Sequence, residues 1–309
     1  ATGGGNWSFC ARLNESVCEM TQAMTGKENL TVTVWNSLAQ PREVPMSFPI
    51  SAALAASGVV VVTSKGAQIP VQLVDERSGA GEGESVNNYQ RKTGEGGDFT
   101  LFFIASLPAL GFQQYVFQSS APDAAAAAVV AAARSTTTYN HDQIAAGSAI
   151  TIENEFNRLT FVNGVLATWE KKGDGANSST TTSFDVTQKF CSYKSSEGDA
   201  HSTQRSGAYI FRPQGENGAK EIAVCTPILN GLLNDKPVEI YAVIQGESNQ
   251  IVAQVRQRFS SWLTQTVTLY KGGQEAVFEF TIGEVPFTEL GTGHEIVSRF
   301  TTAIASNGI

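Results

Sequence analysis

Histidine, cysteine and basic residues are scarce in this sequence, and each shortage argues against a class of function. The 309 residues include 3 His and 4 Cys, and 21 Lys and Arg stand against 29 Asp and Glu. A net charge of -8 without any basic block would repel the phosphate backbone, so no nucleic-acid partner is expected. His141, His201 and His294 lie far apart, without a second His or Cys at metal-ligand spacing. A zinc site built from this chain alone is therefore not expected.

Long apolar runs are also missing. The longest run of small apolar residues, 124–133, is far shorter than the roughly 20 residues that cross a bilayer, so no membrane span is predicted. The first residues, Ala-Thr-Gly-Gly-Gly, include neither an initiator Met nor the regions of a signal peptide. That beginning indicates a product of proteolytic processing.

The sequence offers no self-contained active site. It lacks a Gly-x-Ser-x-Gly elbow and a glycine-rich phosphate loop between a strand and a helix. Glu153 and Glu155 are expected on one face of a strand with Cα atoms about 6.5 to 7 Å apart. Such a pair could serve a glycosidase, but two acids on a solvated sheet face are the commoner arrangement.

Glycosylation triplets indicate an oxidising, secretory compartment. Acceptor sequences occur at Asn6, Asn14, Asn29 and Asn177, and two of them flank Cys10 and Cys18. A disulfide across this short polar loop would remove roughly 2 to 3 kcal/mol of chain entropy, and two free thiols are the less common state in such a compartment. For Cys191 and Cys225, a bond and two buried thiols are equally compatible with the sequence.

Alternating apolar and polar residues predict an all-β chain of antiparallel strands. Leu30, Val32 and Val34 face one way, while Thr31, Thr33 and Trp35 face the other. A hairpin is predicted at Asn163-Gly164, and a bulge or break between Phe156 and Leu159. The predicted strands are 29–35, 58–63, 69–74, 99–105, 112–118, 150–156, 159–162, 238–245, 251–259, 263–270 and 276–282.

These strands fall into two domains of antiparallel type. We predict a disulfide-pinned lead-in at 1–26, a small β-domain at 27–118, an Ala-rich linker at 119–148 and a large β-sandwich at 149–309. Residues 75–98 are rich in Gly, Glu and Ser and are expected to form a solvated loop.

Several stretches resemble glycoside hydrolase family 38, the lysosomal type of α-mannosidase, in the family's order. The most distinctive is Ser206-Gly-Ala-Tyr-Ile-Phe-Arg-Pro213. The others are 13–18, 106–112, 150–155, 257–262, 282–286 and 295–300. The resemblance implies a supersandwich-like large domain and a disulfide between Cys10 and Cys18. It also implies that this chain is the β-rich middle portion of the enzyme.

The same resemblance implies a retaining exo-α-mannosidase that removes terminal α-mannose from N-glycans. In that family zinc is held by His and Asp side chains, one Asp attacks the anomeric carbon and a second acid protonates the leaving oxygen. Those residues precede this chain, so the chain alone is expected to be inactive. His141-Asp142 faintly echoes the zinc stretch, and we interpret the echo as coincidence.

One functional residue of the family can be carried over to this sequence by its motif. Tyr209 matches a family tyrosine whose hydroxyl reaches the sugar pocket, whereas a lone strand Tyr is usually half-buried core. The expected partners are an N-terminal catalytic chain and a C-terminal β-chain of one precursor, in the lysosome or vacuole or outside the cell. Two other functions share this fold: a non-catalytic carbohydrate-binding β-sandwich and a purely structural module.

Overall fold

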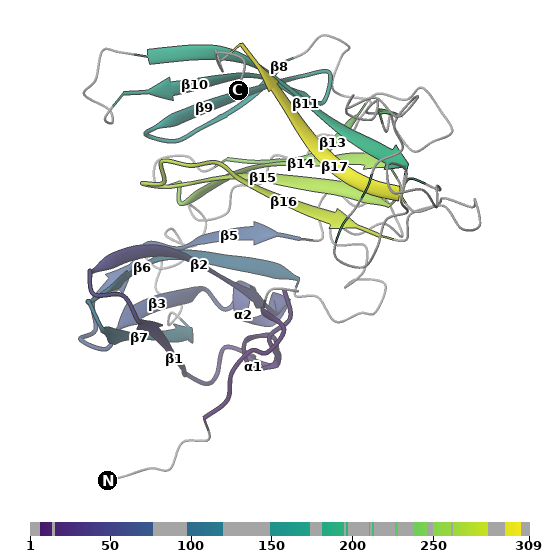
Figure 1. Ribbon diagram of the computed structural model, residues 1–309. Coiled ribbons are helices and arrows are strands. Elements are labelled where there is room, and N and C mark those ends of the chain that lie inside the picture. Colours follow the sequence, from purple (N-terminus) through teal and green to yellow (C-terminus); the bar gives the residue numbers. More distant parts are fainter. Residues whose placement is uncertain are drawn as a thin grey trace. The chain divides into compact units, whose positions relative to one another are not determined.

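The computed structural model describes the chain as a set of antiparallel sheets (Figure 1). The described residues are 7–13, 16–76, 98–119, 149–173, 181–194, 196, 210, 212, 226–227, 238–245, 250–260, 262–283 and 294–303. The predicted linker at 119–148 and the loop at 75–98 fall mainly outside these ranges. Antiparallel pairing runs through several of these sheets, which confirms the predicted all-β class.

Contacts divide the chain into two units. The first comprises 1–140, 241–255 and 268–273, and the second comprises 141–240, 256–267 and 274–309. The predicted domain boundaries remain a prediction.

Two sheets and two short helices form most of the first unit. One sheet has the order β1-β7-β3-β4 and the other has the order β2-β6-β5. The elements are α1 (Glu19–Gln22), β1 (Leu30–Asn36), β2 (Arg42–Ile50), α2 (Ala52–Ala56), β3 (Val59–Thr63), β4 (Gln68–Ile69), β5 (Gln72–Asp75), β6 (Phe99–Leu107) and β7 (Gly111–Ser119). Ser51 caps α2, because its hydroxyl accepts a hydrogen bond from the Leu54 amide at 3.1 Å.

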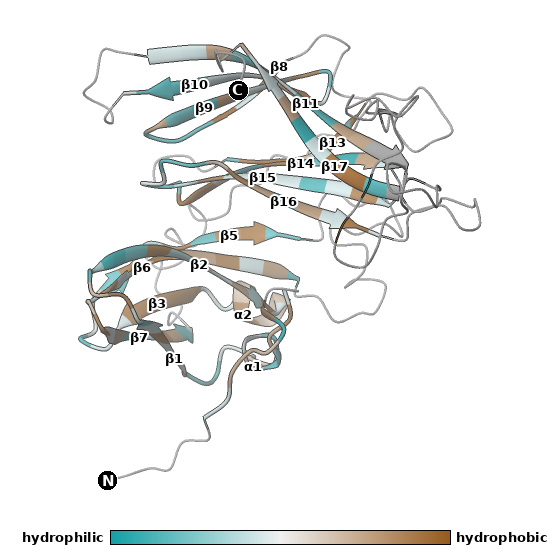
Figure 2. Ribbon diagram, in the orientation of Figure 1, coloured by the Kyte–Doolittle hydropathy of each residue, from teal (hydrophilic) through white to brown (hydrophobic). Residues whose placement is uncertain are grey.

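The inward faces of these two sheets enclose one apolar core. Phe48 from β2, Phe103 from β6 and Phe117 from β7 are buried at its centre, and their rings pack stacked or edge to face. Figure 2 shows that β3, which contributes Val59 and Val61 to this core, is apolar along most of its length. The fold of the first unit is thus a small sandwich.

The opposite face of the β2-β6-β5 sheet packs on residues 241–255 of the same unit. Gln72 fixes this contact: its amide nitrogen donates to the Val252 carbonyl at 2.9 Å, and its oxygen accepts from the amides of Ile251 and Val252 at 2.8 Å each. Phe102 and Ile244 belong to the apolar cluster beside it. Both ends of the buried Gln72 amide are therefore hydrogen-bonded at this junction.

The remaining strands form two further sheets. A six-stranded sheet has the path β12-β11-β10-β9-β8 with β17 also paired to β11, and a four-stranded sheet has the order β13-β14-β15-β16. The strands are β8 (Ala149–Glu153), β9 (Asn157–Val162), β10 (Val165–Lys172), β11 (Thr181–Lys194), β12 (Thr226–Pro227), β13 (Glu239–Ile244), β14 (Val252–Ser260), β15 (Leu263–Tyr270), β16 (Val277–Ile282) and β17 (His294–Thr302).

The predicted hairpin at Asn163-Gly164 is confirmed. It joins β9 to β10, and both residues have positive φ, 50° and 81°. A side chain at Gly164 would also meet the Val238 carbonyl oxygen at 2.1 Å. The predicted break lies slightly earlier than expected, at the turn 154–156 between β8 and β9, and the register shift in this sheet lies between Leu166 and Thr168.

Candidate functional site

The residue that the sequence singles out for sugar contact, Tyr209, lies outside the described residues. Its described neighbours are Ile210, which is exposed, and Arg212, whose carbonyl accepts a hydrogen bond from the Ser196 amide at 2.8 Å. The role of Tyr209 therefore remains a prediction.

The cysteines fall into two places in the chain. A disulfide joins Cys10 to Cys18 with Cα atoms 4.9 Å apart, which is the expected pairing. Cys191 in β11 is also disulfide-bonded, and Cys225 lies outside the described residues. Asn29 is exposed directly before β1, whereas Asn6, Asn14 and Asn177 lie outside the described part.

Glu153 and Glu155 do not share a strand face, contrary to expectation. Strand β8 ends at Glu153, and Glu155 lies in the following turn, because Asn154 accepts hydrogen bonds from the amides of Phe156 and Asn157 and reverses the chain. The Glu153 carboxylate pairs with Arg158 at 2.8 Å and Lys172 at 3.0 Å. Partial burial raises the pKa of Glu153, but the hydrogen bonds and charges of Lys172 and Arg158 outweigh burial, so its pKa is lowered.

The described residues contain no group of three His, Cys, Asp or Glu side chains that could hold a metal ion. His294 begins β17, while His141 and His201 lie outside the described ranges. Within the same described part, no helix is long and apolar enough to cross a membrane.

An exposed aromatic pair stands on the outer face of the first unit. Trp35 in β1 and Phe112 in β7 are direct cross-strand partners, with ring centroids 5.8 Å apart and planes 15° apart. Their exposed fractions are 63% and 51%. The preceding row of the same face pairs Thr33 with Gln114, whose side-chain amide donates to the Thr33 hydroxyl at 3.4 Å.

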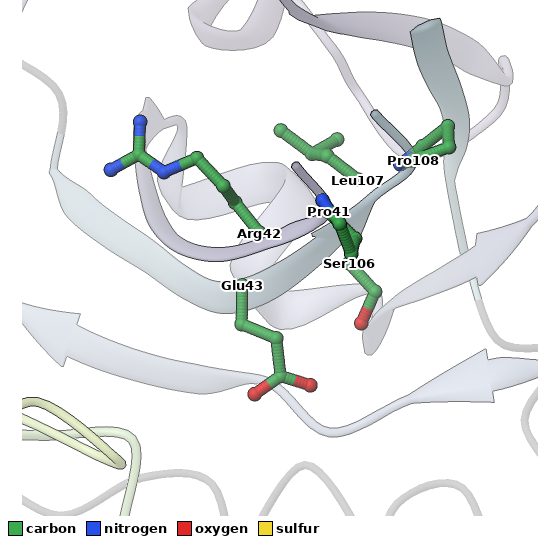
Figure 3. Close-up of a pocket in the computed structure, with 6 residues that line it drawn as sticks. All are labelled: Pro41, Arg42, Glu43, Ser106, Leu107 and Pro108. Carbon is green, nitrogen blue, oxygen red and sulfur yellow. The ribbon is translucent and has the colours of Figure 1, made fainter. Parts of the chain in front are cut away.

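A pocket of about 440 Å³ lies at the end of the sandwich where β1 ends and β7 begins (Figure 3). Its lining residues come from the start of β2 and the end of β6: Pro41, Arg42, Glu43, Ser106, Leu107 and Pro108. Glu43 and Ser106 are register partners and point to the same side, while Arg42 points elsewhere. In the strand register, Glu43 and Ser106 therefore lie on one face of the β2-β6-β5 sheet, and Arg42 lies with Leu107 on the other.

Hydrogen bonds tie the aromatic pair to the loops beside this pocket. Asn36, directly after Trp35, is buried and donates from its side-chain amide to the carbonyls of Gln40 and Pro108, at 2.8 Å each. The Leu110 amide donates to the Leu38 carbonyl at 2.8 Å, and Leu110 has φ of 45°, which is unusual for a residue with a side chain. This geometry holds the two loops together.

Sequence reasoning placed Trp35 on the outer face of its strand but did not single it out as a functional residue. One signal was available: in both 30–36 and 111–119, an aromatic residue occupies a position where the alternation calls for a polar one. We define the aromatic face as Trp35, Phe112, Thr33 and Gln114.

Comparison with known proteins places the chain in a family. Residues 152–309 match the family model Glycosyl hydrolases family 38 C-terminal domain. The Lysosomal alpha-mannosidase of Mus musculus is 30% identical over 303 residues, which cover 98% of this chain and 25% of that protein. The Lysosomal alpha-mannosidase of Dictyostelium discoideum is 28% identical over 97% of this chain and 26% of that protein.

A plant relative gives the same result. The Alpha-mannosidase of Canavalia ensiformis is 29% identical over 97% of this chain and 27% of that protein. The chain thus spans about a quarter of the length of the curated relatives it matches. Because the family model covers more than half of the chain, and the relatives match nearly all of it, this chain belongs to glycosyl hydrolase family 38.

Proposed function

We propose that this chain is the β-rich middle portion of a retaining exo-α-mannosidase that removes terminal α-mannose from N-glycans. The observation that carries the proposal is the collinear match of nearly the whole chain to proteins named as α-mannosidases. Those relatives are about four times as long, which leaves room for a catalytic portion outside these residues.

In this proposal the zinc ion and the reacting acids belong to the catalytic portion. Among the described residues, no group of three His, Cys, Asp or Glu side chains could hold the ion. The partners are an N-terminal catalytic chain and a C-terminal β-chain of the same precursor, in the lysosome or vacuole or in secreted form. The contribution of this chain is to support the catalytic portion and to supply one side chain to its sugar pocket.

Tyr209 is that side chain. The stretch that contains it is anchored on both sides at one strand: β11 ends just before it, and β12, which follows it, returns to pair with β11 at Cys191–Pro227. Cys191 is itself disulfide-bonded, and Cys225 is the only other cysteine in the sequence outside the Cys10–Cys18 pair. A Cys191–Cys225 bond would close this stretch into a loop and reduce the entropy lost when Tyr209 meets a sugar.

A second candidate function is a non-catalytic carbohydrate-binding module. The exposed Trp35–Phe112 pair on a β-sandwich face favours it, because aromatic rings can stack on the C–H face of a pyranose. The first experiment separates the two. The full-length polypeptide that contains this chain is purified and assayed on a chromogenic α-mannoside, and the anomeric form of the first product is determined by NMR.

Release of α-mannose supports the main proposal, and release of the β-anomer would contradict its retaining chemistry. A full-length protein that binds oligomannose but shows no turnover, with zinc supplied, would favour the binding module instead.

The second experiment tests Tyr209 in the full-length enzyme. Tyr209→Phe removes only the hydroxyl, and loss of a hydrogen bond to substrate at about 1 to 3 kcal/mol predicts a roughly five- to 150-fold lower kcat/KM. Tyr115→Phe is the matched control, because the buried Tyr115 hydroxyl donates to the Ser106 carbonyl at 3.1 Å within the sandwich. The control should lower the melting temperature and leave kcat/KM unchanged.

If Tyr209→Phe behaves like the control, Tyr209 is a core residue. The claim that this chain contributes to the sugar pocket then fails.

A further inference from the structure

Strand β16 is an edge strand without the usual protection. It lies last in the order β13-β14-β15-β16, so within the described part of the chain its other side, here called the open side of β16, has no strand partner. Protein edge strands are commonly shortened or interrupted by proline or lysine. Thus β4 and β12 are two residues long and β2 contains Pro45 and Pro49, whereas β16 has six residues without Pro, Gly or Lys. Its open side can therefore pair with another strand.

The backbone of β16 offers hydrogen-bonding groups along this open side. The Gly283 amide donates to the Trp262 carbonyl at 2.7 Å, which continues the pairing of β16 with β15 past the last residue of β16. Because hydrogen-bonded positions alternate in an antiparallel pair, the amides of Phe278, Phe280 and Ile282 point away from β15. A row of amides and carbonyls with this spacing pairs with an extended polypeptide.

The inward row of β16 is only partly covered. Phe278 packs edge to face on Phe300 of β17, with ring centroids 5.1 Å apart, and Phe280 packs on the buried Phe190 of β11 at 5.4 Å. These contacts show that the row faces the six-stranded sheet. Yet Phe280, Ile282 and Phe300 are 42%, 44% and 42% exposed. The apolar interior thus reaches the surface between β16 and β17 (Figure 1).

A sugar fits this surface less well than a polypeptide does. The planes of Phe278 and Phe300 cross at 76° and those of Phe190 and Phe280 at 86°, so the rings form no flat platform for a pyranose. The inward row of β16 also has no polar side chain that could bind sugar hydroxyls. A β-strand uses both features, because its backbone pairs with the open side and its alternate side chains cover the inward row.

The size of the surface favours a strand from the same polypeptide. Three partly exposed side chains are too small a contact for a separate protein, since a stable interface buries about 800 Å² on each side. A tethered strand needs less contact, because the linkage supplies a high effective concentration. The curated relatives are about four times as long as this chain, so most of such a protein lies outside the matched residues.

We propose that the open side of β16 pairs with a β-strand from a part of the same polypeptide outside residues 1–309, and that apolar side chains of this strand cover Phe280, Ile282 and Phe300. The added strand extends the four-stranded sheet and joins it to the rest of the protein. The proposal goes beyond the proposed function, because it rests on the exposed edge and on the length of the relatives and not on the reaction.

Photo-crosslinking in the full-length polypeptide identifies the added strand. Phe280 is replaced by the photoreactive analogue p-benzoylphenylalanine, and the crosslinked peptides are mapped by mass spectrometry. We expect a crosslink to a peptide outside 1–309, with a yield that does not depend on protein concentration. Phe112, an exposed aromatic residue of β7, is replaced by the same analogue as the matched control and should not label that peptide.

Two crosslinking results would overturn the proposal. Crosslinks confined to residues 1–309 would show that this chain covers its own edge, and a yield that rises with protein concentration would show that a second copy covers it.

Hydrogen exchange tests the pairing itself. In the unmodified full-length protein, the amides of Phe278, Phe280 and Ile282 should be protected as well as those of β15. Phe280→Lys places a charge in the inward row and should speed exchange across 277–282 at least about tenfold, whereas Glu279→Lys, on the outward row, should leave it unchanged.

Fast exchange of these three amides in the unmodified protein, or equal effects of the two lysine variants, would contradict the added strand. None of these readouts depends on turnover, so absence of α-mannosidase activity would refute the proposed function alone.

Discussion

The sandwich core of the first unit and the interior of the second unit contain different kinds of side chain. In the first unit, the Phe103 ring lies 6.1 Å from Phe48, 5.0 Å from Tyr115 and 5.9 Å from Phe117, within one continuous apolar cluster. In the second unit, apolar packing between the sheets, with Phe190 and Phe259 at 4.6 Å, is accompanied by a chain of buried glutamines.

The glutamine chain is defined here as Gln188, Gln257 and Gln265. Gln265 lies at its centre: its amide donates to the side-chain oxygens of Gln188 at 2.9 Å and Gln257 at 2.7 Å. The Gln188 amide donates to Gln265 and to the Ser298 hydroxyl, and the Gln257 amide donates to the Gly164 carbonyl. The glutamine chain therefore connects β11, β14, β15 and β17 with the turn between β9 and β10.

The two kinds of interior contribute differently to the stability of the fold and to the choice of one strand register. An apolar core stabilises whatever arrangement buries it, whereas a paired polar chain is satisfied in one register and leaves costly unpaired groups in any other. We infer that the sandwich core of the first unit depends mainly on buried area and that the glutamine chain fixes the strand register in the second unit.

The largest expected effect is a cavity in the first unit. Phe103→Ala removes the ring that contacts three others and should lower the free energy of unfolding by about 3 to 5 kcal/mol. Denaturant unfolding, combined with limited proteolysis to identify which unit opens, provides the measurement. Phe112→Ala, the same change on the exposed face, should cost less than about 1 kcal/mol.

Similar losses for the two variants would contradict the view that the aromatic cluster dominates the first unit. A loss confined to proteolytic sites in the second unit would do the same.

Much of the fold could be predicted because alternation reports directly on which face is buried. The strands near 30–35, 99–105 and 263–270 and the Asn163-Gly164 turn follow from local chemistry. Strand β2 was missed because Pro45 and Pro49 lie inside it, and proline argues against a strand. The sheet order explains the exception: β2 pairs only with β6 among the described strands of its sheet, so its other edge needs no amide donors from these prolines.

The interior of the second unit was harder to predict for a related reason. Glutamine is read as a surface residue, so buried Gln257 and Gln265 could not be identified from periodicity alone. The exposed aromatic pair could not be predicted either. Trp35 stands out only when its cross-strand partner Phe112, far along the chain, is known. Glu155 was misplaced because Asn154 ends the strand through side-chain hydrogen bonds.

An intermediate effect is expected in the glutamine chain. Gln265→Leu leaves the side-chain oxygens of Gln188 and Gln257 buried without their donor, which should cost about 2 to 3 kcal/mol. Gln113→Leu is the matched control, since Gln113 bonds Ser64 at the surface and its loss should change stability by less than about 0.5 kcal/mol. Both free energies come from denaturant unfolding.

Coupling sharpens the same test. Gln188→Leu with Gln265→Leu should cost less than the sum of the single changes, because the two residues share their hydrogen bonds. Additive losses would argue that the glutamines act independently and that they do not fix the register together.

The smallest expected effect is at the surface of the second unit, where polar pairing is solvated. Glu153→Gln removes the charge that pairs with Arg158 and Lys172, and the Glu153 side chain is 49% exposed, so the loss should be below about 1 kcal/mol at pH 7. Because these partners hold the pKa of Glu153 below its ordinary value, its contribution is present above the unfolded pKa of about 4.3 and is lost as pH falls through the folded pKa.

The unmodified protein and Glu153→Gln should therefore differ in melting temperature at pH 7, differ less in high salt, and converge at low pH, where Glu153 is protonated and resembles glutamine. Melting curves over a pH series at two salt concentrations measure this. A difference that persists at low pH would mean that Glu153 acts through shape and packing rather than charge. A loss as large as that of Gln265→Leu would remove the distinction between buried and solvated pairing in this unit.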